Sequence, residues 1–172
     1  MANHPVFPLD NEIMEREASF ADEHGLIFVI DIGKLGSPSS QVPALKALIL
    51  KHPNMKFVVC HLLAPKQSEL DKMQQGLEAL HLPNVWFDLA SLQHNVGPDE
   101  PPFPVTRKFL SCAVETVGAD RLLFGTDTPS NLCRFHYRDM IDTIAEFSYL
   151  TEEEKQAIMY ENAKSVFWSH MV

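Results

Sequence analysis

The stretch from Gly118 to Pro129 reads GADRLLFGTDTP, and it contains the features that decide the fold. Its apolar run ends in Leu122-Leu123-Phe124, which is typical of a short β-strand buried on both faces. Asp127 follows, placed between a glycine and a proline, where the backbone is constrained and the carboxylate can be aimed. The stretch therefore predicts a buried strand that delivers an ionisable group at its carboxyl end.

Working outward, similar apolar runs recur along the chain at intervals of about 30 residues, the length of one βα unit. The predicted strands are Leu26–Ile30, Phe57–Cys60, Val85–Leu89 and Arg121–Phe124. The intervening segments have helical periodicity; they are Glu12–His24, Val42–Lys51, Ser68–Leu80, Val105–Val117, Tyr137–Phe147 and Thr151–Trp168. Together they predict an α/β fold, a (β/α)4 segment with an extra helix in front and parallel strands. We expect residues 1–172 to form a single domain.

Each predicted strand runs into an ionisable residue: Asp31, His61, Asp88 and Asp127. In parallel α/β folds ligands collect at the carboxyl ends of the strands. Carboxylates and an imidazole that converge there can bind a divalent metal or move protons. An aspartate at a strand end also often caps the next turn, and a histidine there can be a simple hydrogen-bonding residue. Cys60, one residue before His61, is expected to point to the opposite side as inert core.

Composition narrows the possible partners and the expected location. With 14 Lys and Arg against 23 Asp and Glu among 172 residues, the net charge is −9. Such a surface repels phosphate groups and anionic lipids, so neither nucleic acid nor membrane is an expected partner. Three cysteines, far apart in sequence, indicate a reducing compartment. Because the sequence shows no signal segment and no bilayer-length apolar run, we expect a cytoplasmic protein.

Three segments resemble the amidohydrolase-related metal-dependent hydrolases, a family that includes aminocarboxymuconate-semialdehyde decarboxylase-like enzymes. The Gly118–Pro129 stretch resembles the last-strand signature of the family, and His52–His61 resembles its sixth strand, which ends in a metal-binding histidine. Thr151–Lys155 and Tyr160–Phe167 resemble its closing helix. The resemblance covers nearly the whole chain. It implies the C-terminal half of a TIM-type (β/α)8 barrel, from about the fifth strand onward.

The resemblance also implies a function and a set of site residues. It implies a metal-dependent hydrolase or non-oxidative decarboxylase that acts on a small carboxylated or cyclic substrate. His61 and Asp127 match the family's metal ligands, Asp31 stands where the family has a histidine, and Asp127 matches the catalytic general acid/base. The implied cofactor is a divalent metal, with zinc as the first expectation, although the family's His-x-His pair is absent from this sequence. That absence favours an alternative, a non-catalytic half-barrel subunit or binding module, and a doubly wound α/β domain is a third interpretation.

A half-barrel has to solve the problem of its open inner face. Residues such as Val29, Val58, Phe87 and Leu123 are expected to line that face, and exposed apolar area of this size is unusual on a monomer. We therefore expect a homo-oligomer or a complementing N-terminal half-barrel as partner. The other candidate residues are weaker: Arg107 and Arg121 as carboxylate clamps, and His94 and His136 as substrate contacts from loops.

Overall fold

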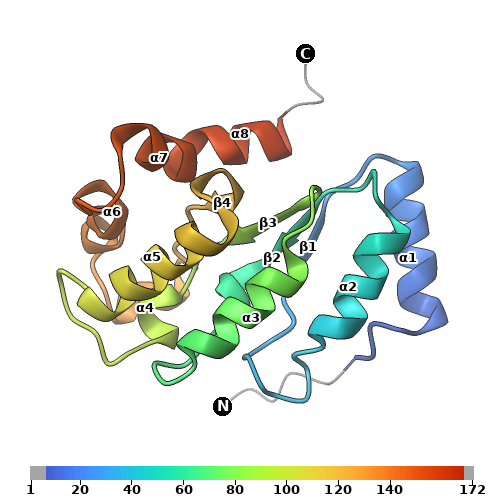
Figure 1. Cartoon of the computed structure of the whole chain (residues 1–172), viewed down its shortest axis with the longest axis horizontal. Coiled ribbons are helices and arrows are strands. Elements are labelled where there is room, and N and C mark those ends of the chain that lie inside the picture. The colour runs from blue at the N-terminus through green and yellow to red at the C-terminus, as the bar shows by residue number, and fades with distance from the viewer. Residues whose placement is uncertain (1–6, 169–172) are drawn as a thin grey trace.

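A computed structural model describes residues 7–168, and a four-stranded parallel sheet lies at its centre (Figure 1). The strands β1 (Phe28–Ile30), β2 (Phe57–Val59), β3 (Val85–Asp88) and β4 (Leu122–Leu123) pair in sequence order. All four predicted strands and their parallel direction are confirmed, although the strands are shorter than the apolar runs. Residues 1–6 and 169–172 lie outside the described residues, and with them the N-terminal segment for which no signal peptide is expected.

Helices connect the strands much as the periodicity predicts. They are α1 (Glu12–Glu23), α2 (Val42–Lys51), α3 (Leu70–Leu80), α4 (Leu92–Asn95), α5 (Pro104–Val117), α6 (Tyr137–Ala145), α7 (Glu152–Gln156) and α8 (Asn162–Phe167). A π-helical turn, Ala157–Glu161, joins α7 to α8. Thr151 starts α7 with a capping box, since its hydroxyl accepts from the Glu154 amide and the Glu154 carboxylate accepts from the Thr151 amide. The four-residue helix α4 was not predicted.

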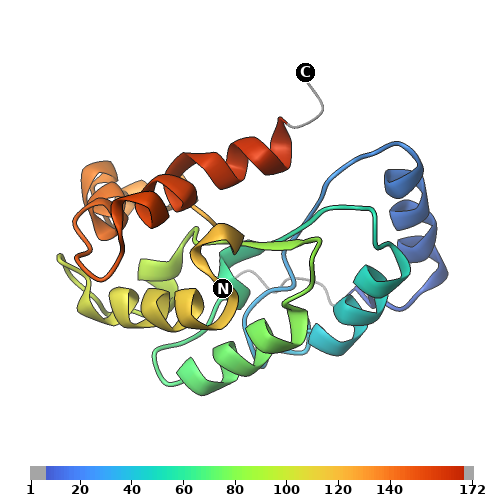
Figure 2. The ribbon, with the colours of Figure 1, turned by 45° about the horizontal axis from the view of Figure 1, so that its top comes forward.

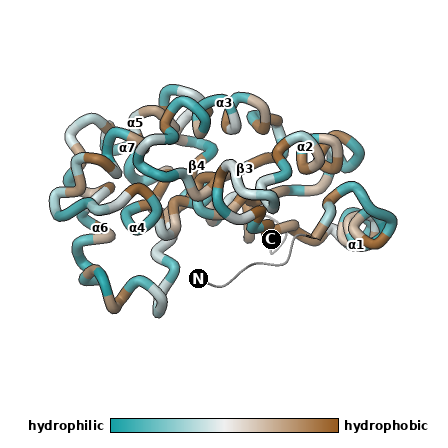
Figure 3. The backbone as a smooth tube through the Cα atoms, turned by 90° about the horizontal axis from the view of Figure 1, so that it is seen from below, coloured by the Kyte–Doolittle hydropathy of each residue, from teal (hydrophilic) through white to brown (hydrophobic). Residues whose placement is uncertain are grey.

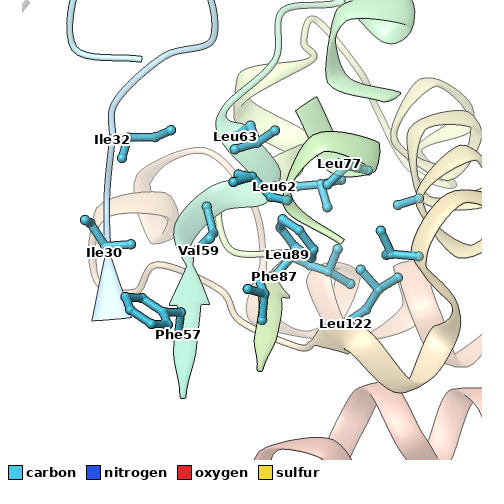
Figure 4. Close-up of a cluster of buried hydrophobic side chains, with 14 of the residues drawn as sticks. Ile30, Ile32, Phe57, Val59, Leu62, Leu63, Leu77, Phe87, Leu89 and Leu122 are labelled. Carbon is cyan, nitrogen blue, oxygen red and sulfur yellow. The ribbon is translucent and has the colours of Figure 1, made fainter. Parts of the chain in front are cut away.

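One face of the sheet forms the main core. Helices α2, α3 and α5 lie side by side over it (Figure 2). The strand residues that face these helices are buried in one cluster with Leu77 of α3 (Figure 4); they include Ile30, Phe57, Val59, Phe87 and Leu122. Hydrophobic stretches of the chain gather at the centre of the molecule, and hydrophilic ones along its outer loops (Figure 3). This one-sided helix layer is the arrangement of a barrel segment.

The opposite face of the sheet is partly covered by α8. Val58 and Leu123 pack against Val166 of α8 and are buried, whereas Val29 is 55% exposed. The expectation that Val58, Phe87 and Leu123 face open solvent is therefore wrong. Phe87 points to the helix side, and α8 lies over the inner side of Val58 and Leu123. At the β1 end of this face, Val29 remains exposed.

The outer edge of β4 is closed by the same C-terminal segment. The amide of Phe124 donates to the Ile158 carbonyl at 2.9 Å. The buried side-chain amide of Asn162 donates to the carbonyls of Ala119 and Leu122, both at 2.8 Å. These bonds occupy backbone groups that would otherwise pair with another strand.

β1 is the other outer strand of the sheet, and within residues 7–168 no further strand pairs with it. Beside it lies a hollow of about 320 Å³, lined mainly by apolar side chains that include Phe7, Met14 and Phe28. The two edges of the sheet are thus unequal. None of the helices between residues 7 and 168 combines the length and the apolar character that a bilayer crossing requires.

Candidate active site at the carboxyl ends of the strands

The four strand-end residues gather at one edge of the sheet. Asp31 follows β1, His61 lies in the turn after β2, Asp88 ends β3, and Asp127 follows β4. The His61 Nε2 lies 3.9 Å from Asp31 Oδ2, and its Nδ1 lies 3.8 Å from Asp88 Oδ1. The parallel register of the strands produces this convergence.

The His61 ring is oriented by its neighbours. Its Nδ1 lies 3.1 Å from the carbonyl oxygen of Ala90. Since a carbonyl can only accept, Nδ1 carries the proton in this bond and the other nitrogen, Nε2, faces Asp31. A histidine whose second nitrogen is fixed by a backbone carbonyl is oriented as metal-binding and catalytic histidines commonly are.

The turn that presents His61 is left-handed. His61, Leu62, Leu63 and Ala64 have φ angles of 60°, 49°, 67° and 47°. For non-glycine residues this conformation costs roughly 1–2 kcal/mol each. Backbone bonds oppose that cost, including Ala64 N to His61 O at 2.7 Å and Leu35 N to Leu63 O at 3.0 Å. Strained backbone held in this way is concentrated at functional sites in proteins.

Asp31 and Asp88 both make the capping contacts expected of a strand-end aspartate. Asp88 Oδ1 accepts from the backbone amides of His61 at 2.9 Å and Ala90 at 3.0 Å. It therefore ties the β2 turn to the β3 turn. Asp31 Oδ1 accepts from the Gly33 amide at 2.7 Å, which leaves Oδ2 as the oxygen near His61.

Asp127 is held by a short chain of polar side chains. The Ser91 hydroxyl donates to Asp127 Oδ2 at 2.5 Å, and the side-chain amide of Asn131 donates to Ser91 Oγ at 2.9 Å. The same amide also donates to the Thr126 carbonyl at 2.9 Å. Because Asn131 fills the acceptor side of Ser91, the hydroxyl proton is directed at Asp127. Ser91 and Asn131 were not among the predicted site residues; the only sequence signal was the position of Ser91 just beyond β3.

Cys60 faces the carboxylates and is not inert core on the opposite side, as expected from the sequence. Burial raises the pKa of its thiol strongly, and so do the negative charges of Asp88, Asp31 and Asp127. The thiol also donates a hydrogen bond to Asp88. In this environment the thiol stays protonated.

The donors present do not make a complete metal site. Between residues 7 and 168 no three His, Cys, Asp or Glu side chains converge closely enough to hold an ion. His61 Nε2 and Asp31 Oδ2 form a pair of potential ligands, whereas a catalytic zinc takes three from the protein. The described residues therefore do not fit a catalytic metal by themselves.

The weaker candidate residues fall into two groups, arginines with structural contacts and histidines on or beside loops. Arg107 donates to the carbonyls of Asp142 and Thr143 and stacks on Phe147, and Arg121 donates to the Pro83 carbonyl, so both have structural contacts. His94 is exposed on α4, and it lies near enough to Asp127 for that residue's negative charge to act on its pKa. His136 is the residue that precedes α6.

Comparison with known proteins agrees with this fold. A family model described as amidohydrolase matches residues 5–167, and the chain belongs to that family. No curated protein matches the sequence.

Solved structures share the architecture at low sequence identity. An amidohydrolase from Burkholderia multivorans with bound HEPES has a TM-score of 0.82 at 19% identity, over 95% of this chain and 61% of its own. A protein of Pseudomonas putida, described as a candidate 2-pyrone-4,6-dicarboxylic acid hydrolase, has a TM-score of 0.76 at 16% identity, over 96% and 59%.

A third structure is a dihydroxybenzoic acid decarboxylase from a Polaromonas species with bound manganese and 2-nitroresorcinol. It has a TM-score of 0.64 at 15% identity, over 93% of this chain and 55% of its own. The chain spans about three fifths of these structures or less. A protein described as a TIM barrel, from Bordetella bronchiseptica, is also similar, and the fold is that of a half-barrel.

Proposed function

We propose that this chain carries the proton-transfer part of a hydrolase or non-oxidative decarboxylase of the amidohydrolase type. The substrate would be a small carboxylated or cyclic molecule. One observation carries the proposal: four parallel strands deliver Asp31, His61 and Asp127 to the same edge of the sheet. The solved relatives support the choice of substrate class, since their descriptions name a pyrone dicarboxylic acid hydrolase and a dihydroxybenzoic acid decarboxylase.

In this proposal Asp127 is the general acid/base. One of its oxygens is held by Ser91, and the side chain is exposed at the carboxyl ends of the strands. Its other oxygen, Oδ1, is free to take a proton from water or substrate and to return it. His61, fixed through Nδ1, directs Nε2 to the same edge and can accept a hydrogen bond there.

We propose His61 and Asp31 as two ligands of a divalent ion; Asp127, the third ligand expected from the sequence, does not converge with them into a three-ligand site within residues 7–168. One of the similar structures holds zinc and another manganese. Such an ion, when bound, would polarise water or a substrate carbonyl. Since the described donors do not complete a site, further ligands would have to come from outside residues 7–168.

A second candidate function is a non-catalytic half-barrel subunit or binding module. It is favoured by the incomplete donor set and by the share of the relatives that the chain spans. In this case the strand-end residues would serve the fold, as the capping bonds of Asp88 do.

Turnover and metal binding separate the two candidates. The purified chain is tested for hydrolysis of 2-pyrone-4,6-dicarboxylate and for release of CO₂ from 2,6-dihydroxybenzoate, with and without Zn²⁺ or Mn²⁺. Turnover that disappears in Asp127→Asn supports the enzyme. Absence of turnover under all conditions, together with no stoichiometric Zn²⁺ binding by titration calorimetry, supports the binding module.

A further inference from the structure

Three basic residues follow the strand ends that carry the candidate site. We call Lys34, His94 and Arg134 the basic rim. Each lies just beyond a strand end: Lys34 in the loop after β1, His94 on α4 after β3, and Arg134 at the end of the helical turn Ser130–Cys133 after β4. All three are exposed.

Hydrogen bonds bring two members of the rim together. Ser91 donates to Asp127, and Asn131 donates to Ser91, so the α4 segment is joined to the turn after β4. His94 comes three residues after Ser91, and Arg134 three residues after Asn131. Because Ser91 and Asn131 are joined to Asp127, and His94 and Arg134 follow them within three residues, both lie in the neighbourhood of Asp127, in agreement with the effect of the Arg134 and Asp127 charges on the pKa of His94.

The third member is fixed by the loop after β1. Leu35, next to Lys34, donates its amide to the Leu63 carbonyl in the left-handed turn after β2, at 3.0 Å. This bond holds the Lys34 loop against the turn that presents His61. Burial lowers the pKa of His94, the charges of Arg134 and Lys34 lower it further, and the charge of Asp127 opposes them. The permanent positive charge of the rim therefore comes from Lys34 and Arg134, and His94 adds a hydrogen-bonding group.

Neither cation of the rim is neutralised within residues 7–168. Arg134 Nη1 donates to the Ser130 carbonyl at 3.3 Å and contacts Cys133 Sγ at 3.5 Å, which orients the guanidinium without a carboxylate partner. Lys34 forms no ion pair in the same part of the chain. In a protein of net charge −9, two cations without acidic partners beside three carboxylates mark a place for an anion from outside.

We propose that the basic rim binds a carboxylate group of the substrate and thereby places the reacting part of that substrate over Asp127. This inference rests on the proposed function and assigns specificity to residues outside the proposed catalytic set. A guanidinium binds a planar carboxylate through two parallel hydrogen bonds, and an ammonium adds a point charge. The carboxylates of the site alone would repel an anion. The two cations of the rim offset that repulsion, and the rim therefore selects for carboxylated ligands.

Ligand binding tests the rim without any turnover. Isophthalate is titrated against the whole chain by isothermal calorimetry, with neutral isophthalamide as the comparison ligand. We expect isophthalate to bind and isophthalamide not to. Arg134→Gln should raise the dissociation constant of isophthalate by about tenfold or more, and Lys34→Gln by a smaller factor, because hydrogen bonds between charged groups are stronger than those between neutral groups. Lys108→Gln, on the exposed side of α5, is the matched control and should bind as the unmodified protein does.

The outcomes separate the rim from the proposed function. Isophthalate binding that depends on Arg134 and Lys34 supports the rim even where no substrate turns over, and in that case only the proposed function fails. Equal affinities for the acid and the amide, or for the Arg134, Lys34 and Lys108 variants, would overturn the rim. Thermal melts of all variants, which should coincide, exclude unfolding as the cause of any loss.

Discussion

Asp127 combines a constrained backbone with an unequal pair of carboxylate oxygens. Its φ of 54° is left-handed, and Oδ2 is held by Ser91. Asparagine keeps the shape and tolerates this backbone conformation, but it cannot carry a proton. We therefore expect Asp127→Asn to lower any turnover by about 100-fold or more while the free energy of unfolding changes by less than about 1 kcal/mol. Rates and urea melts measure the two effects, and unchanged turnover would make Asp127 structural.

Ser91 acts through Asp127 and not on its own. Ser91→Ala removes a hydrogen bond to a carboxylate and leaves one amide hydrogen of the buried Asn131 with fewer acceptors. We expect a loss of stability of about 1–2 kcal/mol, measured by urea denaturation. Ser68→Ala, at an exposed position before α3, is the control and should be neutral. Equal stabilities of the two variants would mean that the Ser91–Asp127 bond contributes nothing to folding.

The raised pKa of Cys60 has a consequence for its reactivity. The thiolate is the form that reacts, and burial together with the nearby carboxylates lowers its fraction at every pH below the shifted pKa. At about pH 8 we expect iodoacetamide to modify the exposed Cys133 well before Cys60, as followed by peptide mass mapping. Denaturation in urea should abolish the difference. Comparable rates in the folded protein would place Cys60 outside the carboxylate cluster.

At the scale of elements, the clip made by Asn162 links α8 to β4. Its side-chain amide donates to the carbonyl of Leu122 and to that of Ala119, which also accepts from the Leu122 amide. Asn162→Ala should cost about 1–3 kcal/mol, because the buried carbonyls lose a hydrogen-bond donor. Ser165→Ala, exposed on the same helix, is the control. Chemical denaturation of both variants measures the difference, and a loss below about 0.5 kcal/mol for Asn162→Ala would contradict the clip.

The elements that could be predicted from the sequence are those set by local pattern. Apolar runs identify all four strands, although the burial on both faces that such runs indicate does not hold for β1, where Val29 is exposed. Helix α4 was missed because Leu92–Asn95 is too short to show a period. The cover that α8 provides was missed because it depends on where the C-terminal helix packs, which no local pattern records.

The same distinction applies to the site. Asp31, His61 and Asp127 could be predicted because they directly follow strands. Ser91 and Asn131 matter through hydrogen bonds between residues that are far apart in the chain. The Ser91–Asp127 bond spans 36 positions and the Asn131–Ser91 bond spans 40. Cys60 was misplaced because it keeps the alternation of β2, on the side of Val58, whereas the left-handed turn rotates His61 out of that alternation.

For the whole molecule, the unequal edges of the sheet limit how it can associate. The β4 edge is bonded to the chain's own C-terminal segment, so a partner strand could pair there only by displacing Ile158 and Asn162. The β1 edge has an exposed Val29 and an apolar hollow beside it. A partner, whether a second copy or a complementing half-barrel, should therefore be added at β1.

This asymmetry predicts the behaviour of the chain alone. An open edge strand is a template for pairing with another chain, and a lysine on such a strand opposes it. We expect light scattering to give a mass above the 19.5 kDa of one chain, and Val29→Lys to shift it toward that value. Tyr160→Lys, at an exposed position in the π-helical turn by β4, is the matched control and should leave the mass unchanged. A complex through β1 should bury at least about 1,000 Å². A clean single-chain mass for the unmodified protein would contradict self-association through β1 and would show that α8 covers the open face well enough for a monomer. A complementing half-barrel would then be the remaining partner for β1.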